Sequence, residues 1–225
     1  KYSNFFIDNL NSLLNAFNFH ELSWTKVVLP IGISFITFHK ISFIIDTYRD
    51  NSKTIVSFNN YLLYILMFPH QIAGPIVRYD EISSQINDRD ENDTIDFKLS
   101  GLFRFIIGLS KKVIIANPLG DFVNGVFLLE VDTISSTTAW ITILAYTFQT
   151  YFDFSGYTDI ALGIAKMYGF DLLPNFNRPF LSTNVTTFWK RMHMSLSFWF
   201  NDYVFKQLSF RYRRWGKYAA VFAVF

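Results

Sequence analysis

The sequence contains no cysteine, which excludes disulfide bonds and thiol catalysis and leaves the redox compartment undetermined. It has no large excess of either charge: 20 Lys and Arg residues oppose 18 Asp and Glu residues, so the chain as a whole carries no electrostatic footprint of nucleic-acid binding. It has neither a G-x-S-x-G elbow nor a Walker-type glycine loop, which argues against serine-hydrolase and phosphate-binding chemistry. Its four histidines are isolated from one another, and the carboxylates near them lack ligand spacing, so no metal site is predicted.

The chain also lacks an initiator methionine and a cleavable signal peptide, and it stops inside an apolar run at 218–225. We therefore expect residues 1–225 to be a fragment of a single multi-helix domain, with its N- and C-terminal parts missing. No internal repeat, low-complexity tract or second soluble domain is evident.

Apolar and aromatic residues are abundant: 51% of the chain is hydrophobic, 20% is aromatic, and 27 residues are Phe. A soluble domain of this length rarely carries so much Phe. The runs 27–45 and 137–154 are about long enough to span a bilayer as helices, and 101–119 and 186–205 are predicted as further helices. The shorter run 61–68, followed by a Gly-Pro break, is typical of a re-entrant segment. The sequence thus predicts an all-α, polytopic transmembrane helical bundle with re-entrant or interfacial helices.

The strongest candidate for chemistry is His193. On a continuous helix His193, Ser197 and Asn201 would lie on one face, next to Trp189 and Phe200. Aromatic surroundings would keep the imidazole neutral and able to act as a general base, with a hydroxyl or amide one turn along fixing its tautomer. An inert, hydrogen-bonded histidine at a helix–membrane interface explains the same pattern, so spacing leaves both interpretations open.

A second polar group occurs between 149 and 159. Gln149 and Asp153 are four residues apart, and so are Ser155 and Asp159. A buried aspartate here could orient the imidazole or bind a cation. We favour pairing with a basic residue, for which the candidates are Lys111, Lys112 and Arg78.

Five ordered blocks resemble the membrane-bound O-acyltransferase family, in particular the branch of the alginate O-acetyltransferase membrane subunit. They are LPIGISFITFHKISFIIDTYR (29–49), FPHQIAGPIVRYDEI (68–82), GLSKKVIIANPLGD (108–121), YTFQTYFDFSGYTDIALGIAKMYGF (146–170) and PNFNRPFLSTNVTTFWKRMHMSLSFWFNDYVF (174–205). The sequence departs from the family pattern in three places: Met192 replaces a Trp, Asn201 replaces an Arg, and His39 replaces a Gln.

The resemblance implies an enzyme of the bacterial cytoplasmic (inner) membrane that crosses it several times and whose helices form a funnel-like cavity. It would move an acyl group, usually acetyl, to hydroxyls of an extracytoplasmic polysaccharide. No bound cofactor is implied; the donor would be acetyl-CoA or an acyl carrier thioester, and a periplasmic or extracytoplasmic transferase is an expected partner. Of the family's two histidines, one maps onto His193 and the other belongs to a W-H-G motif expected beyond Phe225.

The family resemblance also suggests roles for the polar residues between 149 and 159 and for the two lysines. Asp153 and Ser155 would line or brace the cavity, and Lys111 with Lys112 would steer an anionic donor. Three alternatives stay open: a membrane pathway for an anion or sugar, a non-catalytic scaffold, and D-alanyl transfer to teichoic acid.

Overall fold

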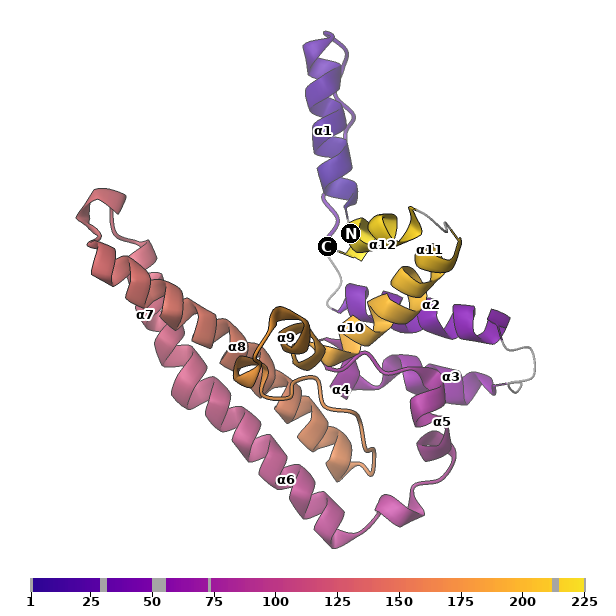
Figure 1. Ribbon diagram of the computed structural model, residues 1–225. Helices are drawn as coiled ribbons and strands as arrows, with labels where there is room; N and C mark the ends of the chain where they lie inside the picture. The colour runs from indigo at the N-terminus through magenta and orange to yellow at the C-terminus, as the bar shows by residue number, and fades with distance from the viewer. Residues whose placement is uncertain (1, 29–31, 50–55, 73, 212–214, 225) are drawn as a thin grey trace.

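The computed structural model describes residues 2–28, 32–49, 56–72, 74–211 and 215–224 (Figure 1). In these ranges every regular element is helical, which confirms the all-α prediction. The α-helices are α1 (Ser3–Ala16), α2 (Ile33–Arg49), α3 (Phe58–Leu66), α4 (Phe68–Gln71), α5 (Tyr79–Asn87), α6 (Ile95–Ser110), α7 (Asn117–Phe127), α8 (Ser136–Met167), α9 (Val185–Arg191), α10 (Met194–Phe200), α11 (Lys206–Arg211) and α12 (Gly216–Val224). Two π-helices, η2 (Lys111–Ala116) and η5 (Asn201–Phe205), and three 3₁₀ turns, η1 (Asp90–Asn92), η3 (Val131–Thr133) and η4 (Pro179–Leu181), complete the set.

A long antiparallel hairpin forms one arm of the molecule (Figure 1). Its first half runs without interruption through α6, η2 and α7, and its second half is the 32-residue helix α8. Both halves begin at a hydroxyl cap: Thr94 accepts from Phe97 N–H at 3.3 Å, and Ser135 accepts from Thr138 N–H at 3.2 Å. The helices predicted at 101–119 and 137–154 are thus confirmed, and both extend further.

Glycines allow the two halves of the hairpin to pack backbone against backbone. A Cβ on Gly108 would lie 2.6 Å from the carbonyl oxygen of Gly156, and one on Gly156 would lie 2.8 Å from that of Gly108. Gly101 and Gly163 face each other in the same way, seven residues from Gly108 and Gly156 along their helices. Such small residues permit close helix contact, and they bring the polar side chains of α6, η2 and α8 together.

The second part of the molecule packs α3, α5 and the segment 170–172 against the end of α8. Its core is an apolar cluster that includes Tyr64, Ile82 and Leu162, all at most 1% exposed. Two buried histidines adjoin it: His39 Nε2 accepts from Val77 N–H at 3.2 Å, and His70 Nε2 donates to the Tyr64 carbonyl at 2.8 Å. Their ring centroids are 4.4 Å apart. These contacts make His39 and His70 structural.

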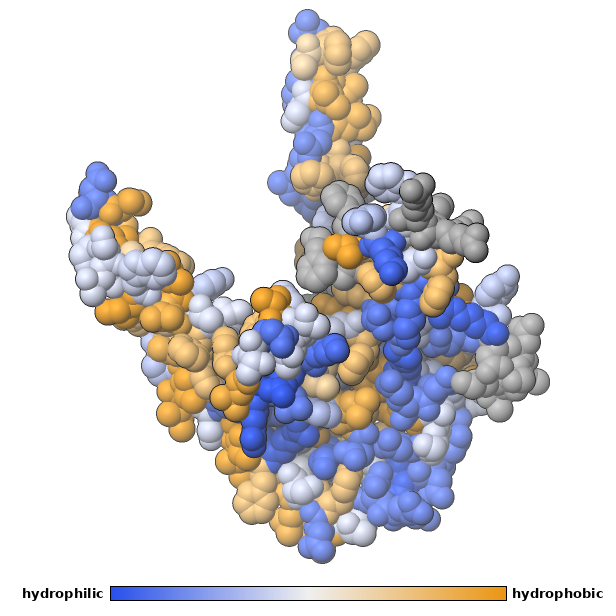
Figure 2. Space-filling model, in the orientation of Figure 1, coloured by the Kyte–Doolittle hydropathy of each residue, from blue (hydrophilic) through white to orange (hydrophobic). Residues whose placement is uncertain are grey.

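Exposed apolar side chains cover much of the hairpin arm (Figure 2). They include Leu102, Phe103, Ile106 and Ile107 on α6 and Trp140, Ile141, Ile143 and Leu144 on α8. In the described ranges, however, no helix combines the length and the apolar character needed to cross a membrane. The crossings expected at 27–45, of which residues 29–31 lie outside the described ranges, and at 137–154 are not confirmed.

Candidate active site

His193 lies at a sharp bend between two short helices. Its φ of 49° and ψ of 54° are left-handed, and they separate α9, which ends at Arg191, from α10, which begins at Met194. The prediction of one continuous helix over 186–205 is therefore wrong. The segment 175–177 is hydrogen-bonded across the bend: Asn177 N–H donates to the Arg191 carbonyl at 3.0 Å, and Met194 N–H donates to the Asn175 carbonyl at 2.8 Å. Both bonds replace contacts that a continuous helix would make.

A pocket of about 380 Å³ opens beside His193. Despite the bend, Ser197 and Asn201 line it together with His193, as their spacing indicated. The remaining walls are mostly apolar and come from Trp189, Leu196, Phe200 and Phe205. A mostly apolar pocket with one imidazole and a few polar groups is the kind of site in which a general base can work.

Aromatic rings surround the imidazole. The Phe154 ring from α8 meets it edge to face at a centroid distance of 4.8 Å, and Phe176 lies 6.4 Å away. This burial lowers the pKa of His193 from 6.5 to about 4, so the ring is neutral at physiological pH. The two flanking helices have seven residues each, and His193 lies outside the segments predicted as membrane spans.

The partner of the imidazole is a residue that sequence reasoning missed. Ser197 Oγ donates to the Trp189 carbonyl at 3.3 Å, so it does not fix the His193 tautomer as expected. Instead, His193 Nδ1 contacts Asn175 Oδ1 at 3.2 Å across 18 residues of sequence. The available signal was the position of Asn175 between Pro174 and Pro179, where an otherwise helical pattern breaks.

The lysines and aspartates predicted as cavity residues form their own ladder between α8 and the α6–η2 helix. Lys111 Nζ donates to Asp159 at 2.5 Å and to Ser155 Oγ at 3.0 Å, and Lys112 Nζ contacts Asp153. Arg104 also binds Asp159, at 3.0 Å. The pairing that we favoured is confirmed for both aspartates. None of these residues lines the pocket beside His193.

Gln149 lies on α8 on the N-terminal side of Asp153, opposite Gly120 of α7. A Cβ on Gly120 would lie 3.1 Å from its Nε2, and its Oε1 is buried without a hydrogen-bond partner among the described residues. Gln149 is thus separate from both the His193 pocket and the lysine–aspartate ladder.

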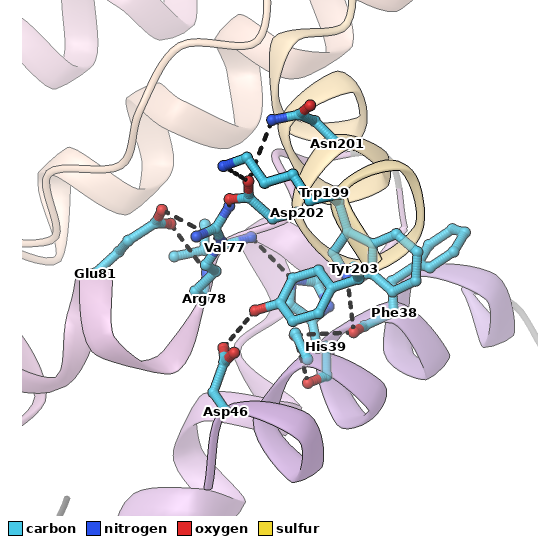
Figure 3. Close-up of polar contacts among 12 residues, drawn as sticks. Phe38, His39, Asp46, Val77, Arg78, Glu81, Trp199, Asn201, Asp202 and Tyr203 are labelled. Carbon is cyan, nitrogen blue, oxygen red and sulfur yellow. Dashed lines mark hydrogen bonds and ion pairs between the residues drawn. The ribbon is translucent and has the colours of Figure 1, made fainter. Parts of the chain in front are cut away.

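A third polar cluster anchors α10 and η5 to the rest of the molecule (Figure 3). Arg78 contacts Asp202, and Tyr203 donates to Asp46 on α2. The Arg78 guanidinium also lies 5.5 Å from the centroid of the Tyr203 ring, and Trp199 Nε1 donates to the Phe38 carbonyl at 3.3 Å. Arg78, which we considered as a partner for an aspartate of the 149–159 group, is therefore bound elsewhere.

Loss of Asp202 is expected to weaken this anchor. Full-length protein carrying Asp202→Ala should be destabilised by about 1–2 kcal/mol, because a partly buried Arg78 would lose its close carboxylate and keep Glu81 at 3.9 Å and the face of the Tyr203 ring. Lys206→Ala removes only the more exposed partner of Asp202 and should cost at most about 0.5 kcal/mol. Denaturant unfolding of both variants in detergent measures the difference, and equal effects would argue against the Arg78 contact as the anchor.

Comparison with known proteins identifies the family of the chain. The model of the membrane-bound O-acyltransferase family matches residues 23–225. The chain is 42% identical to a probable alginate O-acetylase of Pseudomonas aeruginosa, covering 92% of this chain and 39% of that protein. It is 35% identical to a peptidoglycan O-acetyltransferase of Helicobacter pylori (91% and 43%) and 34% identical to a teichoic acid D-alanyltransferase of Bacillus subtilis (80% and 46%). The chain spans less than half the length of these relatives, and it belongs to the membrane-bound O-acyltransferase family.

Proposed function

We propose that the full-length protein is a membrane-embedded O-acyltransferase that moves acetyl groups from a cytoplasmic thioester to hydroxyls of an extracytoplasmic polysaccharide. The observation that carries this proposal is the neutral imidazole of His193 at a mostly apolar pocket. The names of the relatives supply the substrate class, since two of them are called O-acetylase or O-acetyltransferase.

The reaction needs a base because a sugar hydroxyl is a poor nucleophile. The imidazole would take the hydroxyl proton while the oxygen attacks the thioester carbonyl, and the C–S bond then breaks as the ester C–O bond forms. The proton would finally pass to the departing thiolate, so atoms and charge balance. A second histidine, expected past Phe225 from the family resemblance, would share the base and positioning roles.

The proposed placement in the membrane rests on the apolar surface of the hairpin. Exposed apolar side chains along both halves of the hairpin would be costly in water and are typical of a lipid or protein contact. In this proposal several helices of the complete protein form the funnel in which donor and acceptor meet, and the lysine–aspartate ladder braces its wall. Because Lys111 and Lys112 are bound to carboxylates, bracing is a better role for them than steering the donor.

A second candidate is D-alanyl transfer to teichoic acid, which the name of the 34%-identical relative favours. A scaffold or a transport pathway would leave the base at His193 without a role. Reading the chain past Phe225 provides a simple discriminator: a W-H-G motif there favours an enzyme, and its absence favours a pathway or scaffold.

An acyl-transfer assay on reconstituted full-length protein tests the proposal. Vesicles would receive acetyl-labelled or D-alanyl-labelled thioester on the inside and polysaccharide on the outside. We expect the acetyl label to appear as alkali-labile ester on the polymer. Transfer of D-alanyl alone would select the second candidate, and transfer of neither label would contradict the enzymatic function.

A further inference from the structure

Asn175 is the most elaborately bonded side chain near His193. It is 1% exposed, and its Oδ1 lies within hydrogen-bond distance of three donors. These are Ser195 N–H at 3.1 Å, Ser195 Oγ at 2.9 Å and His193 Nδ1 at 3.2 Å. A single oxygen therefore gathers the imidazole and the first turn of α10.

These contacts determine where the imidazole proton resides. A backbone N–H can only donate, so the atom facing Ser195 N–H must be the amide oxygen of Asn175 and not its nitrogen. Since that oxygen only accepts, His193 Nδ1 must carry the hydrogen. The lone pair of the neutral ring is then on Nε2, which has no hydrogen-bond partner among the described residues.

Among the described residues the amide nitrogen of Asn175 makes no hydrogen bond that an aspartate would lose. Nδ2 is buried without a hydrogen-bond partner in the described part of the chain, which is unfavourable. An aspartate would satisfy the same three donors without an orphaned N–H, but its charge would favour the imidazolium form of His193. An asparagine holds the ring and leaves it neutral.

We propose that Asn175 is a positioning residue that holds His193 as the Nδ1–H tautomer and so presents Nε2 as the base. This inference rests on the proposed function. The loop 175–177 then acts on His193 in two ways. Its backbone hydrogen bonds hold the bend at His193, and the side chain of Asn175 fixes the tautomer.

Burial is the only cause that lowers the pKa of His193. The charged side chains on the packed elements include Asp153 and Asp159 on α8, both paired with lysines, and Lys190 and Arg191 on α9. With the pKa at about 4, kcat of the wild type should show no acid limb from His193 above about pH 6. Asn175→Asp should raise that pKa and move the acid limb upward by about 1–3 pH units.

Two further variants separate positioning from folding. Asn175→Leu loses the acceptor and should lower kcat at least about 10-fold at every pH, with little change in KM. Asn177→Asp adds the same charge to the same loop at an exposed position, and its pH profile should coincide with that of the wild type. Because Asn175→Asp keeps all three acceptor contacts, its kcat should return to the wild-type level above the displaced limb.

The full-length protein, with kcat measured from about pH 5 to 9, decides the proposal. A displaced limb in Asn175→Asp but not in Asn177→Asp supports it. Coincident profiles for wild type and Asn175→Asp, together with inactive His193→Ala, would overturn this proposal alone. Wild-type turnover by His193→Ala would instead overturn the catalytic assignment of the proposed function and this proposal with it.

Discussion

Full-length protein carrying His193→Asn is expected to lose acyl transfer by about 10²–10⁴-fold while it folds as stably as the wild type. Asparagine tolerates the left-handed backbone that His193 adopts, and its amide N–H can replace Nδ1–H as the donor to Asn175. It cannot take a proton from a hydroxyl at neutral pH. The variant therefore removes the base and keeps the anchor.

His193→Ala removes both and provides the comparison. It should lose activity to the same extent, with an additional loss of stability because an alanine at positive φ is strained and Asn175 Oδ1 loses a donor. His20→Asn is the matched control, since His20 is exposed and lies outside the site. Turnover at neutral pH and the melting temperature would be measured on the same preparations. An active His193→Asn protein would show that His193 is an anchor and that the base lies elsewhere.

The parts of the fold that could be predicted from the sequence depend on local pattern. Apolar residues alternating with basic ones predicted the helix at 101–119, and a long apolar run predicted the one at 137–154, because helix formation there needs only neighbours along the chain. The pairing of Asp153 and Asp159 with Lys111 and Lys112 followed from the cost of burying unpaired charges. The sequence left three candidate partners open, and the fold showed that α8 faces Lys111 and Lys112 while Arg78 binds Asp202.

The parts that could not be predicted depend on contacts between distant segments. The pattern from 186 to 205 is compatible with one helix, and only the hydrogen bonds from 175–177 break it at His193. For the same reason Asn175 read as a helix-breaking loop residue, and its role became visible once the fold placed it beside the imidazole. The pocket role of Ser197 and Asn201 survives the bend because α10 and η5 carry both residues onto the same wall.

Gly108→Ala is expected to destabilise the full-length protein by about 3 kcal/mol or more, although alanine is the better helix former. The new methyl group would lie 2.6 Å from two backbone atoms of α8, the Gly156 carbonyl oxygen and the Ile160 nitrogen. Backbone atoms inside a helix cannot move aside as a side chain can, so the two halves of the hairpin must separate. Separation would also stretch the contacts of Lys111 and Arg104 with Asp159.

Gly125→Ala on α7 is the matched control, because nothing lies within 4 Å of its added methyl group. Helix propensity then acts alone, and the variant should be stabilised by up to about 1 kcal/mol. The two substitutions are chemically identical, so opposite shifts in melting temperature would isolate backbone contact as the reason for Gly108. Similar shifts would contradict the close packing of α6 on α8. Since α8 also carries Phe154 against His193, acyl transfer by Gly108→Ala should fall together with its stability.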